Sequence, residues 1–184
     1  MRPTQPIDVY CVFTGPIEQV SVQRITNSLA AATVPSNNVR EMHLLFHSAG
    51  GSVPDGVFLY NLFRAFPIDL TVYNGGSVQS VATIAYLGAK KRKASASATF
   101  LIHRTTGTVQ ATPASGLHAV ADSVTLDDRR TEAILRSHIK LSDEQWSNFD
   151  KHQLVFSAED AVRIGLAHEI GDFSPPAGTQ IFNV

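Results

Sequence analysis

Short apolar runs alternate with segments of helical periodicity through the first half of the chain. The apolar runs are bounded by polar or glycine-rich turns, which is typical of buried strands. Between them, apolar residues recur every three or four positions, as on one face of an amphipathic helix. This pattern predicts strands at 8–15, 41–51, 69–74 and 98–104, and helices at 17–33, 54–66 and 78–89. Strands that alternate with helices indicate an α/β fold with parallel strands.

The pattern changes in the second half of the chain. A polar segment containing glycine and proline at 105–116 precedes a long polar helical pattern at 117–139. A second helix is predicted at 142–150, because Ser142 and the glutamine at 145 have the spacing of a capping box. This part of the chain therefore predicts helices rather than further alternation.

The C-terminal region predicts one more small unit. Segment 155–173 is interpreted as a strand, a capped helix that begins after Ser157, a turn at Gly165 and a short closing strand. The tail at 174–184 shows no strong periodicity and is expected to be loose. Because no repeat and no boundary is visible, residues 1–184 are interpreted as a single domain.

Composition and charge exclude several classes of partner. With 43% hydrophobic and 17% charged residues, the 184-residue chain is globular, and its net charge of −1 gives no field that would attract nucleic acid or a membrane. The basic run at 90–93 is interpreted as a solvated turn. The single cysteine, Cys11, excludes an internal disulfide and a cysteine-built zinc site. No segment has the length of a signal peptide or a membrane span, so a cytoplasmic location is expected.

Two glycine-rich turns connect predicted strands to predicted helices. They are "SAGGSV" at 48–53 and "GSVQSVA" at 76–82. Such turns expose backbone N–H groups that can hold a phosphate or form an oxyanion hole. Neither turn matches the phosphate-loop or dinucleotide patterns, so a phosphate site is only weakly supported.

A serine nucleophile would need a histidine as its base. The second turn holds Ser77 and Ser80, either of which could instead cap a helix. His103 ends the next predicted strand, 23 residues after Ser80, which is enough for a helix and a returning strand. This spacing suggests a Ser–His pair but does not establish one.

Three segments of the sequence resemble the proteolytic subunit of the bacterial Clp protease, in the same order and at similar spacing. They are "LLFHSAGGSVPDGVFLYNLFRAF", "GGSVQSVATIAYLGAKKRKASASATFLIHR" and "VFSAEDAVRIGLAHEIGDF". The resemblance implies a ClpP/crotonase-like fold of repeated β-β-α units, with a protruding strand–helix handle at about 105–140. It also implies a serine peptidase that needs no metal and no cofactor.

The resemblance assigns expected roles to individual residues. Gly76 stands four positions before Ser80, as in the family's nucleophile motif, so Ser80 rather than Ser77 matches the nucleophile. His103 matches the general base. The N–H groups of Gly51 and Val81 match the donors of the oxyanion hole.

The third member of the catalytic triad departs from the family pattern. Where the family has an aspartate four residues before the serine that opens the last helix, this chain has Gln153. Asp150 lies three residues earlier and could take the role. The sequence leaves three possibilities: a dyad assisted by Gln153, a triad completed by Asp150, or an impaired site.

The expected partners follow from the same resemblance. They are a peptide or unfolded protein as substrate and further copies of the chain in a homo-oligomeric ring. The first strand begins near residue 8, which leaves little room for the axial loops that dock an ATPase unfoldase in the family, so dependence on such a partner is not expected. The alternatives are a catalytically impaired ring subunit or scaffold for an active homologue, and a crotonase-type acyl-CoA enzyme.

Overall fold

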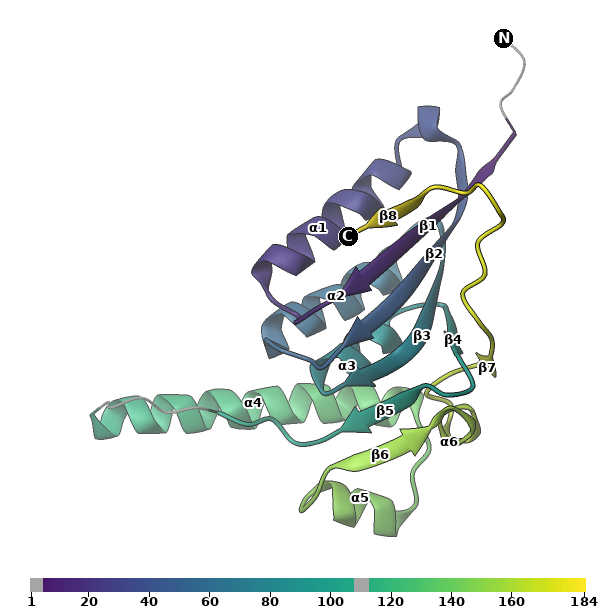
Figure 1. Cartoon of the computed structure of the whole chain (residues 1–184). Coiled ribbons are helices and arrows are strands. Elements are labelled where there is room, and N and C mark those ends of the chain that lie inside the picture. The colour runs from purple at the N-terminus through teal and green to yellow at the C-terminus, as the bar shows by residue number, and fades with distance from the viewer. Residues whose placement is uncertain (1–4, 108–112) are drawn as a thin grey trace.

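The computed structural model describes residues 5–107 and 113–184 (Figure 1). The strands are β1 (Ile7–Thr14), β2 (Val39–Ser48), β3 (Asp69–Gln79), β4 (Lys91–Ala94), β5 (Thr99–Ile102), β6 (Leu154–Ser157), β7 (Glu169–Ile170) and β8 (Ile181–Asn183). The helices are α1 (Gln19–Ala32), the 3₁₀ turn η1 (Pro35–Asn37), α2 (Val53–Ala65), α3 (Val81–Leu87), α4 (Ala114–His138), α5 (Asp143–Phe149) and α6 (Ala158–Ile164). The alternation predicted for the first half of the chain is confirmed.

The described strands form one sheet in the order β6-β5-β3-β2-β1-β8, with β4 paired to β3 and β7 paired to β4. All pairs are parallel except β5 with β6. Strand β3 changes partner along its length: residues 71–74 pair with β4, and residues 77–79 pair with β5. It therefore runs to Gln79, and the helix that was predicted from residue 78 begins at Val81.

The hydrophobic core lies between the sheet and the helices α1, α2 and α3, which cover one side of it (Figure 1). Alternation along β2 directs Met42, Leu44 and Phe46 into this core. Every residue of α3 is buried. Helix α3 is therefore held on all sides, which fixes the turn that precedes it.

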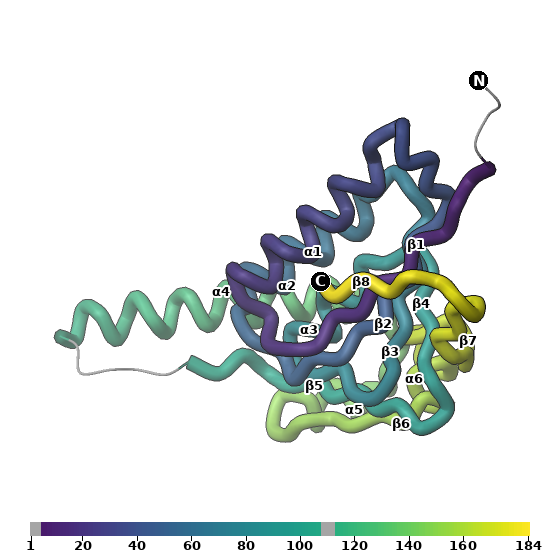
Figure 2. Tube along the Cα trace, turned by 45° about the horizontal axis from the view of Figure 1, so that its top comes forward, coloured from purple at the N-terminus to yellow at the C-terminus, as the bar shows by residue number. Residues whose placement is uncertain are grey.

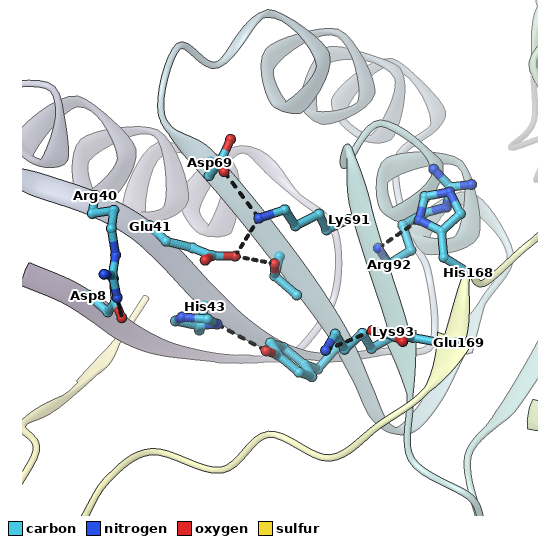
Figure 3. A network of polar contacts seen from close by, with 12 residues as sticks. Asp8, Arg40, Glu41, His43, Asp69, Lys91, Arg92, Lys93, His168 and Glu169 are labelled. Carbon is cyan, nitrogen blue, oxygen red and sulfur yellow. Dashed lines mark hydrogen bonds and ion pairs between the residues drawn. The ribbon is translucent and has the colours of Figure 1, made fainter.

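The opposite side of the sheet carries polar side chains that bond across the strands (Figure 3). Glu41 of β2 accepts hydrogen bonds from the Thr71 hydroxyl at 2.6 Å and the Lys91 ammonium at 3.2 Å. His43 Nδ1 and the Tyr73 hydroxyl share a hydrogen bond of 3.0 Å. This face is thus tied together by polar contacts between neighbouring strands.

The basic run at 90–93 is not a solvated turn, and that prediction is wrong. Three of its residues belong to β4, and strand alternation turns Arg92 inward, where it is 6% exposed. Its guanidinium donates to the carbonyls of Ala89, Leu166 and Gly165 at 2.9, 2.9 and 3.2 Å. Backbone carbonyls satisfy the buried charge, which is a contact that local sequence does not reveal.

Helix α4 extends away from the body of the molecule (Figure 2). It supplies the helix of the expected handle. Residues 105–107, where the strand of the handle was expected to begin, form no regular strand, and residues 108–112 lie outside the described residues. Within residues 5–107 and 113–184, no helix combines the length and apolar character that a membrane span requires.

The C-terminal region contains the predicted small unit and one difference. Ser142 and Ser157 cap α5 and α6 as expected, and Gly165 ends α6 in a left-handed conformation. The tail expected to be loose ends in β8, which extends the sheet beside β1. The buried Val184 donates its N–H to the Val12 carbonyl at 3.0 Å, so main-chain pairing orders a segment that has no side-chain periodicity.

Candidate active site

Ser80 occupies the sharp turn between β3 and α3 in a strained conformation. Its φ of 54° and ψ of −132° lie outside the regions that side chains other than glycine favour. Its N–H donates to the Leu101 carbonyl at 2.7 Å, and its carbonyl accepts from the Thr83 N–H at 3.0 Å. Such backbone strain concentrates at functional sites, and a strained strand-to-helix turn is a known way to present a nucleophile.

Ser77 has a different environment. It lies within β3, opposite Thr99 of β5, and its hydroxyl accepts a hydrogen bond from the Gln79 amide at 2.8 Å. Unlike Ser80, it does not line either of the pockets described below. The two serines therefore lie in different surroundings, and only Ser80 lines these pockets.

The first glycine-rich turn lies directly against the second. Gly50 and Gly51 have φ values of 103° and 152°, which favour glycine. Gly50 O accepts from the Ile17 N–H and Ile17 O accepts from the Ser52 N–H, both at 2.8 Å. This bridge to Ile17 uses the atoms on either side of Gly51 and leaves the Gly51 N–H to other acceptors.

A pocket of about 60 Å³ brings four of the predicted site residues together: Ser80, His103, Gly51 and Val81. Val81 is the first residue of α3, where an N–H has no helix carbonyl to bond. Gly51 and Val81 thus line the same pocket as Ser80. Two backbone N–H donors can stabilise the negative charge that develops on a carbonyl oxygen under nucleophilic attack.

The remaining wall of this pocket combines apolar and threonine side chains from several elements. Helix α4 contributes Thr131 and Leu135, so the handle helix shapes the site. Val53 of α2, Ile84 of α3 and Ile102 of β5 add apolar side chains, and Thr105 and Thr106 complete the lining. The apolar part of this wall favours contact with apolar groups.

His103 follows the last residue of β5, as the sequence predicted. Its Nδ1 forms a hydrogen bond of 2.5 Å with the carbonyl of Arg104. Within residues 5–107 and 113–184, no hydrogen bond joins the ring to Ser80, Asp150 or Gln153. His103 and Ser80 thus line the same pocket, and the imidazole ring of His103 is hydrogen-bonded to the carbonyl of the next residue, Arg104.

Both candidates for the third member of the triad line a second pocket of about 450 Å³, together with Ser80 and His103. Asp150 follows α5 and is ion-paired to Arg104, whose Nε lies 3.0 Å from its carboxylate. Gln153 is exposed and belongs to none of the hydrogen bonds of the described residues. The structure brings both near the site but joins neither to the histidine.

Arg104 is the residue that sequence reasoning missed. Its guanidinium also pairs with Glu132 of α4 at 2.6 Å and lies 4.7 Å from the ring centre of Phe149. Burial opposes ionisation of Glu132, but hydrogen bonds and charge from Arg104 and Arg136 outweigh it and lower the pKa of Glu132. The only local signal was a cation directly after the histidine, since its partners lie far away in sequence.

Comparison with known proteins agrees with this arrangement. The model of the Clp protease family matches residues 8–173. The chain is 25% identical over 169 residues to ATP-dependent Clp protease proteolytic subunit 3 of Streptomyces coelicolor, covering 90% of this chain and 77% of that protein. It is 27% identical over 166 residues to the ATP-dependent Clp protease proteolytic subunit of Lactococcus lactis subsp. lactis, covering 89% and 83%. A solved structure of a ClpP1 mutant from Listeria monocytogenes has a TM-score of 0.75 at 20% identity, covering 90% of this chain and 91% of that one. The expected ClpP-like α/β fold is thereby confirmed.

Proposed function

The chain belongs to the Clp protease family, and from this premise we propose that it is a serine endopeptidase that hydrolyses peptide bonds through an acyl-enzyme on Ser80. The observation that carries the proposal is the strained Ser80 in one pocket with His103, Gly51 and Val81. The substrate class is a peptide or an unfolded protein.

The residues would divide the reaction as follows. The Ser80 hydroxyl oxygen attacks the peptide carbonyl carbon while His103 accepts its proton. The N–H groups of Gly51 and Val81 stabilise the oxyanion. His103 then gives its proton to the leaving amine as the C–N bond breaks. In the second half of the reaction, water attacks the acyl carbon while His103 accepts its proton, and His103 returns that proton to the Ser80 oxygen as the acyl group leaves.

The apolar residues of the pocket beside Ser80 support a preference for the substrate residue before the scissile bond. Val53, Ile84, Ile102 and Leu135 line the small pocket beside Ser80. A substrate side chain that enters this space would exchange water for apolar contact. We therefore expect cleavage after small apolar residues.

Assembly into a homo-oligomeric ring belongs to the same proposal. Families of this kind enclose the site by assembling copies, and α4 projects from the body in a position to contact another copy (Figure 2). Mass measurement of the native assembly, with the peptidase assay on the separated species, tests whether the ring is the active form.

One observation favours a second candidate, a catalytically impaired ring subunit. No hydrogen bond joins Ser80 to His103 within the described residues, and the family's aspartate position holds Gln153. Catalytic hydrogen bonds are often long in free enzymes and tighten on substrate, so the peptidase stays the first candidate.

A hydrolysis assay decides between the two. The assembled protein would be incubated with a chemically unfolded protein and with short fluorogenic peptides, and the new termini would be identified by mass spectrometry. Cleavage that disappears in Ser80→Ala and in His103→Ala supports the peptidase. Cleavage that persists in Ser80→Ala would contradict it, and a folded ring that cleaves nothing would favour the impaired subunit.

A further inference from the structure

We propose that Asp128 of α4 takes the place of the missing triad carboxylate and positions His103 through the peptide group that joins Arg104 to Thr105. This inference rests on the proposed function, because it concerns the base of that site. It assigns a positioning role to a residue on the handle helix that the sequence did not single out.

The first step is the hydrogen bond between His103 and Arg104. The Arg104 carbonyl oxygen lies 2.5 Å from Nδ1 of the ring. A carbonyl can only accept, so the proton of this bond sits on Nδ1. In the neutral ring the other nitrogen, Nε2, is then free to accept a proton. This is the tautomer that a base acting on Ser80 requires.

The second step is the other end of the same peptide group. The Thr105 N–H donates to Oδ1 of Asp128 at 2.6 Å. A peptide is planar, and in its trans form the C=O and N–H point in opposite directions. The Asp128 carboxylate therefore fixes the plane whose carbonyl holds His103. The carboxylate also polarises this peptide group, because hydrogen bonds in a chain strengthen one another.

The third step concerns the carboxylates that could compete for His103. Arg104 binds Glu132 at 2.6 Å and Asp150 at 3.0 Å, so both acids are engaged by its guanidinium. Asp128 is the acid on α4 that contacts the main chain beside the histidine. Asp128, Thr131, Glu132 and Leu135 follow one another at helical spacing, and all four face this site.

Kinetics of labelling by a fluorophosphonate test the role. Asp128→Ala should lower the maximal labelling rate about 10- to 100-fold, the effect of losing one charge-assisted hydrogen bond, and leave the half-saturating probe concentration unchanged. Asp128→Asn should recover part of the rate, since its side-chain oxygen can still accept from Thr105. Asp122→Ala, an exposed aspartate of the same helix, is the matched control.

Three outcomes of the labelling experiment would overturn the inference. One is an Asp128→Ala protein, folded by circular dichroism, that labels at the wild-type rate. The others are a maximal labelling rate in Asp150→Asn or in Gln153→Ala that is as low as in His103→Ala, because those residues would then act on the ring directly.

A measurement independent of activity separates this inference from the proposed function. Long-range ¹H–¹⁵N spectra of protein with ¹⁵N-labelled histidine report the imidazole tautomer, with His103→Gln to assign the signal. The Nδ1–H tautomer is expected in the wild type, with loss of that preference in Asp128→Ala. An Nε2–H tautomer in the wild type would overturn the inference, even if Ser80 reacts normally, whereas the expected tautomer on an unreactive protein would contradict only the peptidase.

Discussion

Gly50 lies against Ser80 so closely that a Cβ added to the glycine would come within 2.7 Å of the Ser80 Cβ. The two turns of the site therefore fit together only when the first lacks a side chain. Gly50→Ala should push Ser80 out of its strained turn, slow fluorophosphonate labelling more than tenfold, and cost about 1–3 kcal/mol of stability.

Gly178→Ala is the matched control for this substitution. Gly178 also has a positive φ, of 82°, but a Cβ there would meet nothing within 4 Å. It should lose some stability and keep its labelling rate. Equal labelling by the two variants would show that contact between the turns does not hold the nucleophile.

Specificity should depend on the handle helix. Thr131 lines the pocket of about 60 Å³, so Thr131→Ala should enlarge it and shift cleavage toward larger apolar residues by about tenfold in kcat/KM. Thr125→Ala removes the same atoms from an exposed position of α4 and should leave the preference unchanged. The check is kcat/KM for peptides that differ only in the residue before the scissile bond, and identical profiles would place that side chain elsewhere.

Arg92 should contribute more to stability than any lysine of the basic run. Arg92→Met leaves three backbone carbonyls without their donor, and the free energy of unfolding should fall by about 3 kcal/mol or more. Lys90→Met, at an exposed position, should change it by less than about 0.5 kcal/mol. Urea titration measures both, and a small effect at Arg92 would mean that water replaces the guanidinium.

Much of the site could be predicted from sequence because its parts are local. A strand followed by Gly50 and Gly51, and another that ends before Ser80, can be recognised from short sequence patterns. His103 could be placed near Ser80 because one helix and one returning strand connect the two residues. The role of Asp128 could not be predicted, because its contact joins a polar helix to a backbone N–H 23 residues away. A polar helical face carries several acidic residues, and only the packing of the helix decides which of them contacts the main chain beside His103.

The same reasoning explains the errors in the fold. The charged residues of β4 do not resemble a buried strand in sequence. Arg92 is buried because carbonyls that accept from it lie partly in the C-terminal region, far away in the chain. The tail at 174–184 has no apolar alternation, and β8 forms through main-chain pairing with β1. In both places, a distant partner decides what the local pattern leaves open.

Stability should fall as the solution is acidified from neutral pH. Burial lowers the pKa of His43 below its ordinary value of 6.5; Glu41 and Asp8 oppose this shift, and two lysines add to it. Burial likewise lowers the pKa of His138 and His168. Below pH 6.5 the unfolded chain binds more protons than the folded one, so the stabilisation present above that pH is lost as pH falls through the folded pKa values.

Urea unfolding between pH 7.5 and 5.5 measures this loss. His43→Gln should reduce the slope of unfolding free energy against pH, whereas His118→Gln, exposed on α4, is the control and should not. A slope that His43→Gln leaves unchanged would show that the cross-strand network in Figure 3 accommodates the protonated ring.

Intact-mass analysis after fluorophosphonate treatment tests directly whether Ser80 is an activated nucleophile. One adduct is expected on the wild type and on Ser77→Ala, and none on Ser80→Ala. An adduct that survives Ser80→Ala, or no adduct on a folded and assembled wild type, would contradict the assignment of Ser80 as an activated nucleophile.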